Sequence, residues 1–328
     1  MYIMCLNQVA FSELFFDTDF RNLDYHQVNM NYLIKICLSL CCCIALISSC
    51  AKCDMPSDDK LIVTFSLTSS EDITRAYGNG AMVNDLRYAI YPQGDWENPL
   101  IIKTVNDAFA GESISATIQE ELINGNSYTI LFWADYDADT YINNTRARYD
   151  IDWNTNIVTM YTDDLTAQDE KLDAFFAKVD FTANSGRIPV ELKRPFSQLN
   201  IATNSYDSNV EVTQTALTIE AYTQFDLWTG DVVEQSKETL NFASAPIPSA
   251  ADEVTIEVNG VAYKRLFMSY ILVGDGEYTT DATFTVRGKQ NGGAEQDLFT
   301  TTFRDLKLKR NSRTNVVGNI VNSGLRSN

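Results

Sequence analysis

Histidine is nearly absent from this chain, which holds a single one, His26, among 328 residues. Imidazole is the usual general base for nucleophilic enzymes and a common metal ligand. Because His26 lies upstream of the leader described below, the mature protein would carry no histidine. This argues against Ser-His-Asp and Cys-His catalysis, so we expect no catalytic residues, no cofactor and no enzymatic activity.

Glycoside hydrolysis needs only two carboxylates, so composition alone leaves it open. The acidic pairs Asp163-Asp164 and Asp169-Glu170 are adjacent in sequence. Neighbouring side chains rarely face one reacting bond, and such pairs are typical of solvated loops.

Basic residues are also scarce, with 25 Lys plus Arg against 44 Asp plus Glu and a net charge of −19. Nucleic acids and anionic membrane surfaces attract basic patches. The composition therefore predicts no nucleic-acid partner.

Cysteine has little structural use here. Five of the seven cysteines precede the predicted mature protein: Cys5, Cys37, Cys41, Cys42 and Cys43. Cys50 and Cys53 remain, and without histidine they cannot supply the four ligands of a structural zinc site. Neither a disulfide framework nor a zinc site is expected.

Residues 31–50 form a secretory signal, in which Lys35 precedes an apolar run over 36–47 and then small residues. The sequence Ile47-Ser48-Ser49-Cys50 resembles the lipobox of bacterial lipoproteins, which predicts lipidation of Cys50. Acyl chains would then hold the protein in outer-membrane lipid. An ordinary signal peptide or an uncleaved anchor is the alternative.

Met30 directly precedes this signal. We therefore interpret residues 1–29 as a misread start, 30–49 as the lipoprotein signal peptide and 50–60 as an acidic tether. Three acids beside the lipid site resemble the stretch that marks surface-exported lipoproteins: Asp54, Asp58 and Asp59. The expected location is the cell outer membrane, with the protein exposed at the surface.

Downstream of the tether, short β-branched and aromatic runs recur between turn residues, as in antiparallel sandwiches. The alternation over 86–91 places Leu86, Tyr88 and Ile90 on one face of a strand. The continuous apolar run over 128–134 predicts a central strand buried on both faces. Further strands are expected at 61–65, 188–192, 266–273, 282–286, 298–303 and 316–321.

Two local signals predict turns. Asn259-Gly260 separates two alternating runs and suits a type I′ hairpin. Gly125 precedes Tyr128, whose phenolic hydroxyl is expected to pin a sandwich corner.

The mature chain exceeds the ~250 residues at which single cores usually stop growing. We therefore predict an all-β fold of two tandem antiparallel β-sandwich domains, 61–186 and 187–328, divided near Asn184-Ser185-Gly186. The best helical candidate is 166–178. No clear sequence repeat relates the halves, so any duplication would be structural only.

Asp135, Asp137 and Asp139 alternate as the first ligands of a calcium loop do. The match fails further on, because Thr140 stands where the turn needs glycine and Arg146 where it needs glutamate. An exposed acidic loop is the default interpretation, and no metal site is predicted.

The four tryptophans could stack on sugar rings where they are exposed. Trp133 lies in the most apolar run and is expected in the core, whereas Trp96 lies among turn residues. Trp96 is the candidate ligand-stacking residue, although tryptophans are usually largely buried.

Several stretches together resemble the fimbrillin-like lipoproteins of anaerobic Gram-negative, Bacteroides-type bacteria, including a related domain family of uncharacterised function. The most specific are RPFSQLNI (194–201) and RNSRTNVVGNI (310–320). The others are TRAYGNG (74–80), 86–91, 128–134, DAFF (173–176) and YILV (270–273).

That resemblance implies two transthyretin-like or Ig-like sandwiches and a subunit of surface fimbriae that takes part in adhesion. In such subunits a protease cuts after an arginine near the N-terminus, the first strand leaves, and a neighbour's strand fills the groove. Arg75 is the candidate processing site, and cleavage there would release the strand at 61–65. An arginine in an exposed loop is the alternative interpretation.

Such subunits commonly carry an additional C-terminal donor segment, but this chain ends with Asn322-Ser-Gly-Leu-Arg-Ser-Asn soon after its last apolar run. An anchoring, terminal or accessory subunit therefore stays open beside a polymerising one. The partners implied are other fimbrial subunits, by β-strand addition, and surface receptors or glycans. The alternative function is a surface glycan-binding lipoprotein of a nutrient-capture system.

Overall fold

The computed structural model describes residues 59–69, 80, 82–109, 114–136, 147–204, 207–247 and 255–327. The chain divides into two compact units, Met1–Ser57 and Asp58–Asn328, and every described residue belongs to the second unit. Expectations for the leader, Cys50 and the start of the tether lie outside the described residues.

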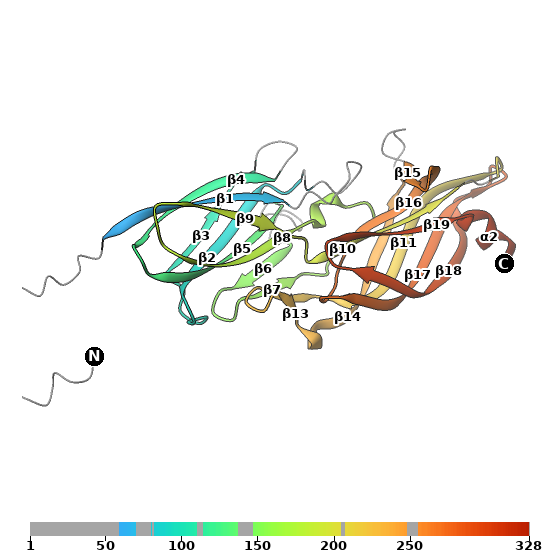
Figure 1. The fold of residues 1–328 in the computed structure, drawn as a ribbon. Coiled ribbons are helices and arrows are strands. Elements are labelled where there is room, and N and C mark those ends of the chain that lie inside the picture. Colours follow the sequence, from blue (N-terminus) through green and yellow to red (C-terminus); the bar gives the residue numbers. More distant parts are fainter. Residues whose placement is uncertain are drawn as a thin grey trace, which may run out of the picture. The chain divides into compact units, whose positions relative to one another are not determined.

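Strands dominate the described unit (Figure 1). The first half contains β1 (Lys60–Ser69), β2 (Asp85–Pro92), β3 (Ile101–Val105), β4 (Ser115–Ile123), β5 (Ser127–Asp135), β6 (Tyr149–Asp152), β7 (Ile157–Met160), β8 (Phe175–Thr182) and β9 (Arg187–Leu192). The second half contains β10 (Phe196–Thr203), β11 (Val210–Tyr222), β12 (Gln224–Asp226), β13 (Asp231–Val232), β14 (Lys237–Pro246), β15 (Thr255–Val258), β16 (Val261–Leu272), β17 (Glu277–Gln290), β18 (Gln296–Lys309), β19 (Ser312–Gly318) and the helix α2 (Ile320–Ser327).

The two halves repeat one topology. In the first, the sheet β4-β1-β9 packs against the sheet β3-β2-β5-β8 around one apolar core. In the second, β16-β10-β19 takes the place of β4-β1-β9, with β15 added at its edge, and β14-β11-β17-β18 takes the place of β3-β2-β5-β8. The all-β sandwich fold is confirmed, and the duplication is visible in the structure although the sequence shows no clear repeat.

Each repeat also contains one parallel pair within its otherwise antiparallel sheets. β1 runs parallel to β9, and β10 runs parallel to β19. In both cases the first strand of the repeat is joined to its last strand. The first strand thus lies in the middle of its sheet.

A further sheet, β13-β12-β7-β6, takes strands from both halves of the chain. It covers part of the outer face of β2 and β5 and lies in one continuous apolar cluster with the second sandwich. The Trp133 ring lies 5.2 Å from the Tyr149 ring and 6.2 Å from the Phe225 ring. The run 128–134 is therefore buried on both faces, as predicted.

Both predicted turns are confirmed. Asn259 and Gly260 have φ values of 52° and 76°, as the hairpin between β15 and β16 requires. The Tyr128 hydroxyl accepts a hydrogen bond from the backbone N–H of Ile123 at 3.3 Å, across the turn that contains Gly125. Tyr128 pins this corner as expected.

The helix expected at 166–178 is wrong. Only residues Glu170–Leu172 form a short 3₁₀ turn, and β8 begins at Phe175. Phe175 pairs with Ala134 of β5 and is fully buried, so sheet pairing and burial outweigh the helical propensity of the segment.

Two other strand expectations differ in detail. β19 ends at Gly318, and the predicted strand end at Val321 instead lies in α2. Val321 and Leu325, four residues apart, pack on the second core, a helical spacing that a short strand pattern hides. The strand after Gly186 forms as expected, but this strand, β9, pairs with β1 of the first repeat. The division after Gly186 stays a prediction.

Candidate functional site

The N-terminal strand β1 is the central strand of its sheet, between β4 and β9 (Figure 1). It runs antiparallel to β4, with Phe65 opposite Ile118, and parallel to β9, with Phe65 beside Ile188. Neither β4 nor β9 has another partner in this sheet among the described strands. The sheet exists only while β1 lies in it.

β1 alternates between a buried and an accessible face. Val63, Phe65 and Leu67 are fully buried in the first core, while Ile62 on the other face is 61% exposed. The Phe65 ring lies edge-on to two rings of the facing sheet, 5.0 Å from Phe181 and 6.1 Å from Phe132. β1 therefore fills an apolar groove with one row of side chains.

One wall of this groove carries a buried acid. Glu120 of β4 is 5% exposed and lies on the same face as Ile118 and Leu122, which are apolar. Its carboxylate accepts hydrogen bonds from the Tyr88 hydroxyl and from the Lys103 ammonium, which lies 2.7 and 2.8 Å from the two oxygens. Burial, followed by the hydrogen bond to Glu120, raises the pKa of Tyr88, which stays protonated as the donor.

The connection from β1 to β2 contains Arg75, which lies outside the described residues together with the rest of 70–79. The chain is described again at Gly80, whose φ is +75°. A Cβ atom there would lie 2.5 Å from Ile114 Cδ1 and 3.0 Å from the Phe175 ring, so a larger residue would displace these core side chains and would also have to adopt a positive φ.

The equivalent strand of the second repeat, β10, is covered on both faces. All eight of its residues are buried. The segment before β8 lies over its sheet, because the Gln168 backbone N–H donates to Met268 O at 2.9 Å and the Gln168 side chain donates to Leu266 O at 2.8 Å. Among the described residues the outer face of β1 is less covered, since each side chain on that face is at least partly accessible.

A buried ion pair fixes the start of β10. The Arg194 guanidinium donates two hydrogen bonds of 2.6 Å to the two carboxylate oxygens of Asp173, and it stacks 4.6 Å from the Phe175 ring centre. Asp173 directly follows the 3₁₀ turn, so this pair joins the covering segment to the second sandwich.

The two most specific sequence motifs lie side by side as the strands β10 and β19. Asn200 pairs with Asn315 and their side-chain amides are joined by a 2.9 Å hydrogen bond. The hydroxyls of Ser197 and Thr314 are 3.3 Å apart. The motifs therefore have a structural role, which is to hold the central strand of the second repeat.

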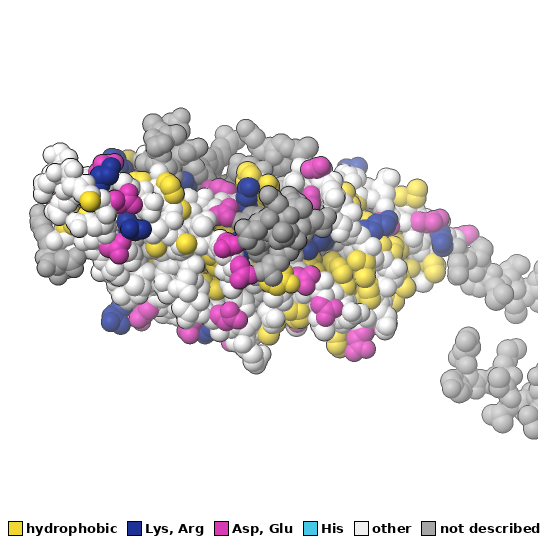
Figure 2. All heavy atoms as spheres, turned by 180° about the vertical axis from the view of Figure 1, so that it is seen from behind, with side chains coloured by type: hydrophobic (Ala, Val, Ile, Leu, Met, Phe, Trp, Pro, Cys, Tyr) yellow, Lys and Arg dark blue, Asp and Glu magenta, His cyan; other side chains and the backbone are white. Residues whose placement is uncertain are grey.

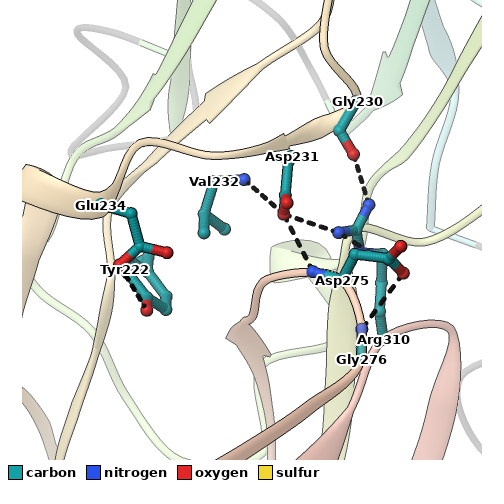
Figure 3. A network of polar contacts seen from close by, with 8 residues as sticks. All are labelled: Tyr222, Gly230, Asp231, Val232, Glu234, Asp275, Gly276 and Arg310. Carbon is teal, nitrogen blue, oxygen red and sulfur yellow. Dashed lines mark hydrogen bonds and ion pairs between the residues drawn. The ribbon is translucent and has the colours of Figure 1, made fainter.

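Arg310, which begins the second motif, joins the β18–β19 turn to the sheet β13-β12-β7-β6 (Figure 3). Its guanidinium donates to Gly230 O and, at 2.8 Å, to Asp231 Oδ1. The same oxygen accepts the backbone N–H groups of Val232 and Asp275, each at 2.9 Å. The Asp231 carboxylate thus gathers three segments of the chain.

Trp96, the candidate stacking residue, lies in the loop between β2 and β3 and is 45% exposed. Its backbone carbonyl accepts a 2.8 Å hydrogen bond from the fully buried Asn156. Leu100 and Ile102 are also exposed and follow closely in sequence. Figure 2 shows hydrophobic side chains on the surface of the first half of the described chain, seen from behind.

The acidic candidates do not form an exposed cluster with Asp135. Asp135 is fully buried and pairs with the Arg87 guanidinium, while Asp137 and Asp139 lie outside the described residues. Burial raises the pKa of Asp135 to about 6, against the opposing effect of Arg87. Within the described ranges, no group of three or more His, Cys, Asp or Glu side chains is placed to hold a metal ion.

Sequence reasoning missed Glu120 and the pair of Arg194 with Asp173. The sequence does contain an indication of Glu120, because this acid occupies an inward position of an alternating run between Ile118 and Leu122. No local pattern indicates the pairing of Arg194, because its partner Asp173 precedes it by 21 residues and lies on another segment.

The fold defines a tandem β-sandwich protein in which β1 is the central strand of one sheet of the first sandwich. Residues 56–327 match the protein family described as "Family of unknown function (DUF6562)", and the chain belongs to this family. No curated protein matches the chain. In the part of the chain that the structure describes, no helix has the length and apolarity needed to span a bilayer.

Among solved structures, the chain is similar to a fimbrial assembly protein from Parabacteroides distasonis, with 11% identity and a TM-score of 0.43 over 79% of this chain and 90% of that one. It is also similar to the fimbrial anchor protein Mfa2 from Porphyromonas gingivalis, with 14% identity and a TM-score of 0.40 over 74% of this chain and 76% of that one. These names agree with the resemblance to fimbrillin-like lipoproteins, and the family match agrees with its uncharacterised branch. Similarity at this level assigns no role to the chain by itself.

Proposed function

We propose that this protein is a non-enzymatic structural protein of the cell surface that acts in fimbrium assembly or adhesion, as a subunit or as an anchor or accessory protein. It is held in the outer membrane by a lipid on Cys50 and joined to partners by exchange of β1. The observation that carries the proposal is the position of β1, which lies between two strands that have no other partner in their sheet among the described strands.

Removal of β1 would open a groove that a partner strand can fill. The backbone groups of β4 and β9 that face β1 would lose their hydrogen bonds, and the apolar floor around Phe132 and Phe181 would be exposed. Burying three large apolar side chains contributes about 5–9 kcal/mol. An incoming strand with alternating apolar residues would restore the backbone hydrogen bonds and the apolar burial. This mode of binding is β-augmentation.

The internal repeat supplies a reason why only β1 exchanges. β10 occupies the same position, but it is buried on both faces and fixed at its start by Arg194 and Asp173. β1 exposes much of its outer face, in contrast to β10. The connection after β1 also contains Arg75, so a single cleavage there would detach the strand.

A strand-exchange experiment tests the proposal with a built-in control. A recognition site for a sequence-specific protease is placed within 71–78, the full chain is cut, and a labelled peptide of residues 60–69 is added. The control chain is cut within the equivalent connection, 204–207, and receives a labelled peptide of residues 196–203.

We expect the first chain to take up its peptide and to release its own β1, as seen by native mass spectrometry. We expect the control chain to keep β10. If the first chain remains folded after cutting yet takes up no peptide, strand exchange is wrong.

Lipid attachment and processing are tested separately. Intact mass of the protein from a native-like host should show acylation that the Cys50→Ala chain lacks. Treatment with an arginine-specific protease should give a new N-terminus at Ala76, and the Arg75→Ala chain should not show it. An unacylated mass for the parent chain contradicts the anchor, and survival of the bond after Arg75 contradicts the processing site.

A further inference from the structure

The face of β4 that lines the groove has one polar position, Glu120, among apolar side chains. The inward side chains of β4 are Ala116, Ile118, Glu120 and Leu122, and they lie opposite Leu67, Phe65, Val63 and Leu61 of β1. Three of these four pairs are wholly apolar. At the fourth, Val63 lies directly opposite the buried acid Glu120.

The Glu120 carboxylate has capacity for one more donor. A carboxylate offers about four acceptor sites. Three are occupied, one by the Tyr88 hydroxyl and two by the Lys103 ammonium. Directly opposite residues on one face of an antiparallel pair have Cβ atoms about 4.5–5.5 Å apart, so a short side chain at position 63 lies next to this cluster.

We propose that Glu120 determines which strands the groove accepts, by making position 63 the one inward position that takes a hydroxyl side chain. The partner strand is then an extended segment with large apolar residues opposite Ile118, Ala116 and Leu122, and with Ser, Thr or Val opposite Glu120. This inference rests on the proposed function, in which β1 is replaced by a partner strand.

The physical reason is the cost of an unpaired buried hydroxyl. Valine and threonine have nearly the same shape, but a buried hydroxyl without a hydrogen-bond partner destabilises the folded state. Opposite Glu120 the hydroxyl donates to the carboxylate, and a hydrogen bond to a charged group is among the stronger ones. Opposite Ile118 or Ala116 the groove offers only apolar side chains.

A double-mutant cycle in the intact full chain tests this without any strand exchange. The matched control is Val190→Thr, because Val190 is also buried in the first core, and it lies on β9 away from Glu120. We expect Val63→Thr to change the unfolding equilibrium constant threefold or less, and Val190→Thr to raise it at least tenfold. In a Glu120→Met background, Val63→Thr should also raise it at least tenfold.

Equal costs for Val63→Thr and Val190→Thr, or a cost of Val63→Thr that does not depend on Glu120, would overturn the inference. If the Glu120→Met chain does not fold, Glu120→Leu serves as the apolar background, and the comparison of the two valines decides in either case.

The strand-exchange assay separates this inference from the proposed function. A labelled 60–69 peptide with Val63→Thr should bind the cut chain within threefold of the parent peptide, whereas Phe65→Thr or Leu67→Thr should weaken binding at least a hundredfold. If no peptide binds at all, the proposed function fails while the double-mutant cycle still decides the role of Glu120.

Discussion

The side-chain amide of Asn200 donates a 2.9 Å hydrogen bond to the amide oxygen of Asn315, 115 residues further along the chain. This contact joins the first and last strands of the second repeat, β10 and β19. The first repeat is closed in the same way by β1 and β9, but β1 has a face that solvent reaches. The difference between these two equivalent strands motivates the predictions below.

The anchor of β1 in its groove is Phe65. We expect Phe65→Ala to destabilise the protein by about 3–5 kcal/mol, because it removes a buried ring and leaves a cavity. Ile62→Ala on the accessible face of the same strand should change stability by about 0.5 kcal/mol or less. Urea unfolding of both chains measures this, and similar effects for the two would mean that β1 does not fill an apolar groove.

Arg194 and Asp173 should behave as a buried ion pair. Removing one partner, as in Arg194→Met, leaves an unpaired buried charge and should cost about 3–5 kcal/mol. The double variant Arg194→Met with Asp173→Leu should recover much of this loss, since no charge is then buried alone. Denaturant unfolding of the parent, of Arg194→Met, of Asp173→Leu and of the double variant tests the coupling, and simple additivity of the losses of the two single variants would contradict it.

Asp135 predicts a pH dependence of stability. Its folded pKa of about 6 lies above the ordinary aspartate value of 3.8, so the folded state binds the proton more tightly than the unfolded state does. The stability contributed by this group is therefore present below about pH 4 and is lost as the pH rises to about 6. Relative to an Asp135→Asn chain, the parent should lose stability across this window.

The control for that measurement is Asp150→Asn, which alters an exposed carboxylate on β6. Thermal unfolding between pH 4 and 7 should show the parent losing stability relative to Asp135→Asn, whereas the pH profile of Asp150→Asn should follow that of the parent. A pH profile for Asp135→Asn that runs parallel to that of the parent contradicts the assignment.

Substitutions at Gly80 and Gly94 distinguish the cost of steric crowding from the cost of a left-handed backbone conformation. Both have positive φ, +75° and +83°, but only at Gly80 would a Cβ meet neighbouring atoms, at 2.5 Å from Ile114. Gly94→Ala should cost about 1–2 kcal/mol for the left-handed backbone alone. Gly80→Ala should cost clearly more, as measured by urea unfolding, and an equal cost would show that the core yields at this point.

The alternation and turn chemistry of the sequence predicted the sandwich fold well. The run over 128–134, the Asn259-Gly260 hairpin and the Tyr128 corner are local signals, and each is confirmed. These features depend on residues near one another in sequence, which is why a pattern could reveal them.

The predictions failed or were incomplete for segments whose secondary structure or strand pairing depends on residues distant in sequence. Residues 166–178 have helical propensity, but Phe175 pairs with Ala134 of β5 instead. A strand was predicted at 188–192 and forms within β9, but its pairing with β1 depends on residues more than a hundred positions away. In the candidate site, apolar alternation predicted β1, whereas the partners of Glu120 come from two other strands and could not be read from its own segment.

The closure of each repeat by its last strand also has a consequence in time. A ribosome adds about 5–20 residues per second, so Asn200 is made roughly 6 to 23 s before Asn315, which accepts its hydrogen bond. Until then β10, the central strand of its sheet, lacks one neighbour, just as β1 lacks one until β9 is made. The order of synthesis thus leaves each repeat open until its final strand is made.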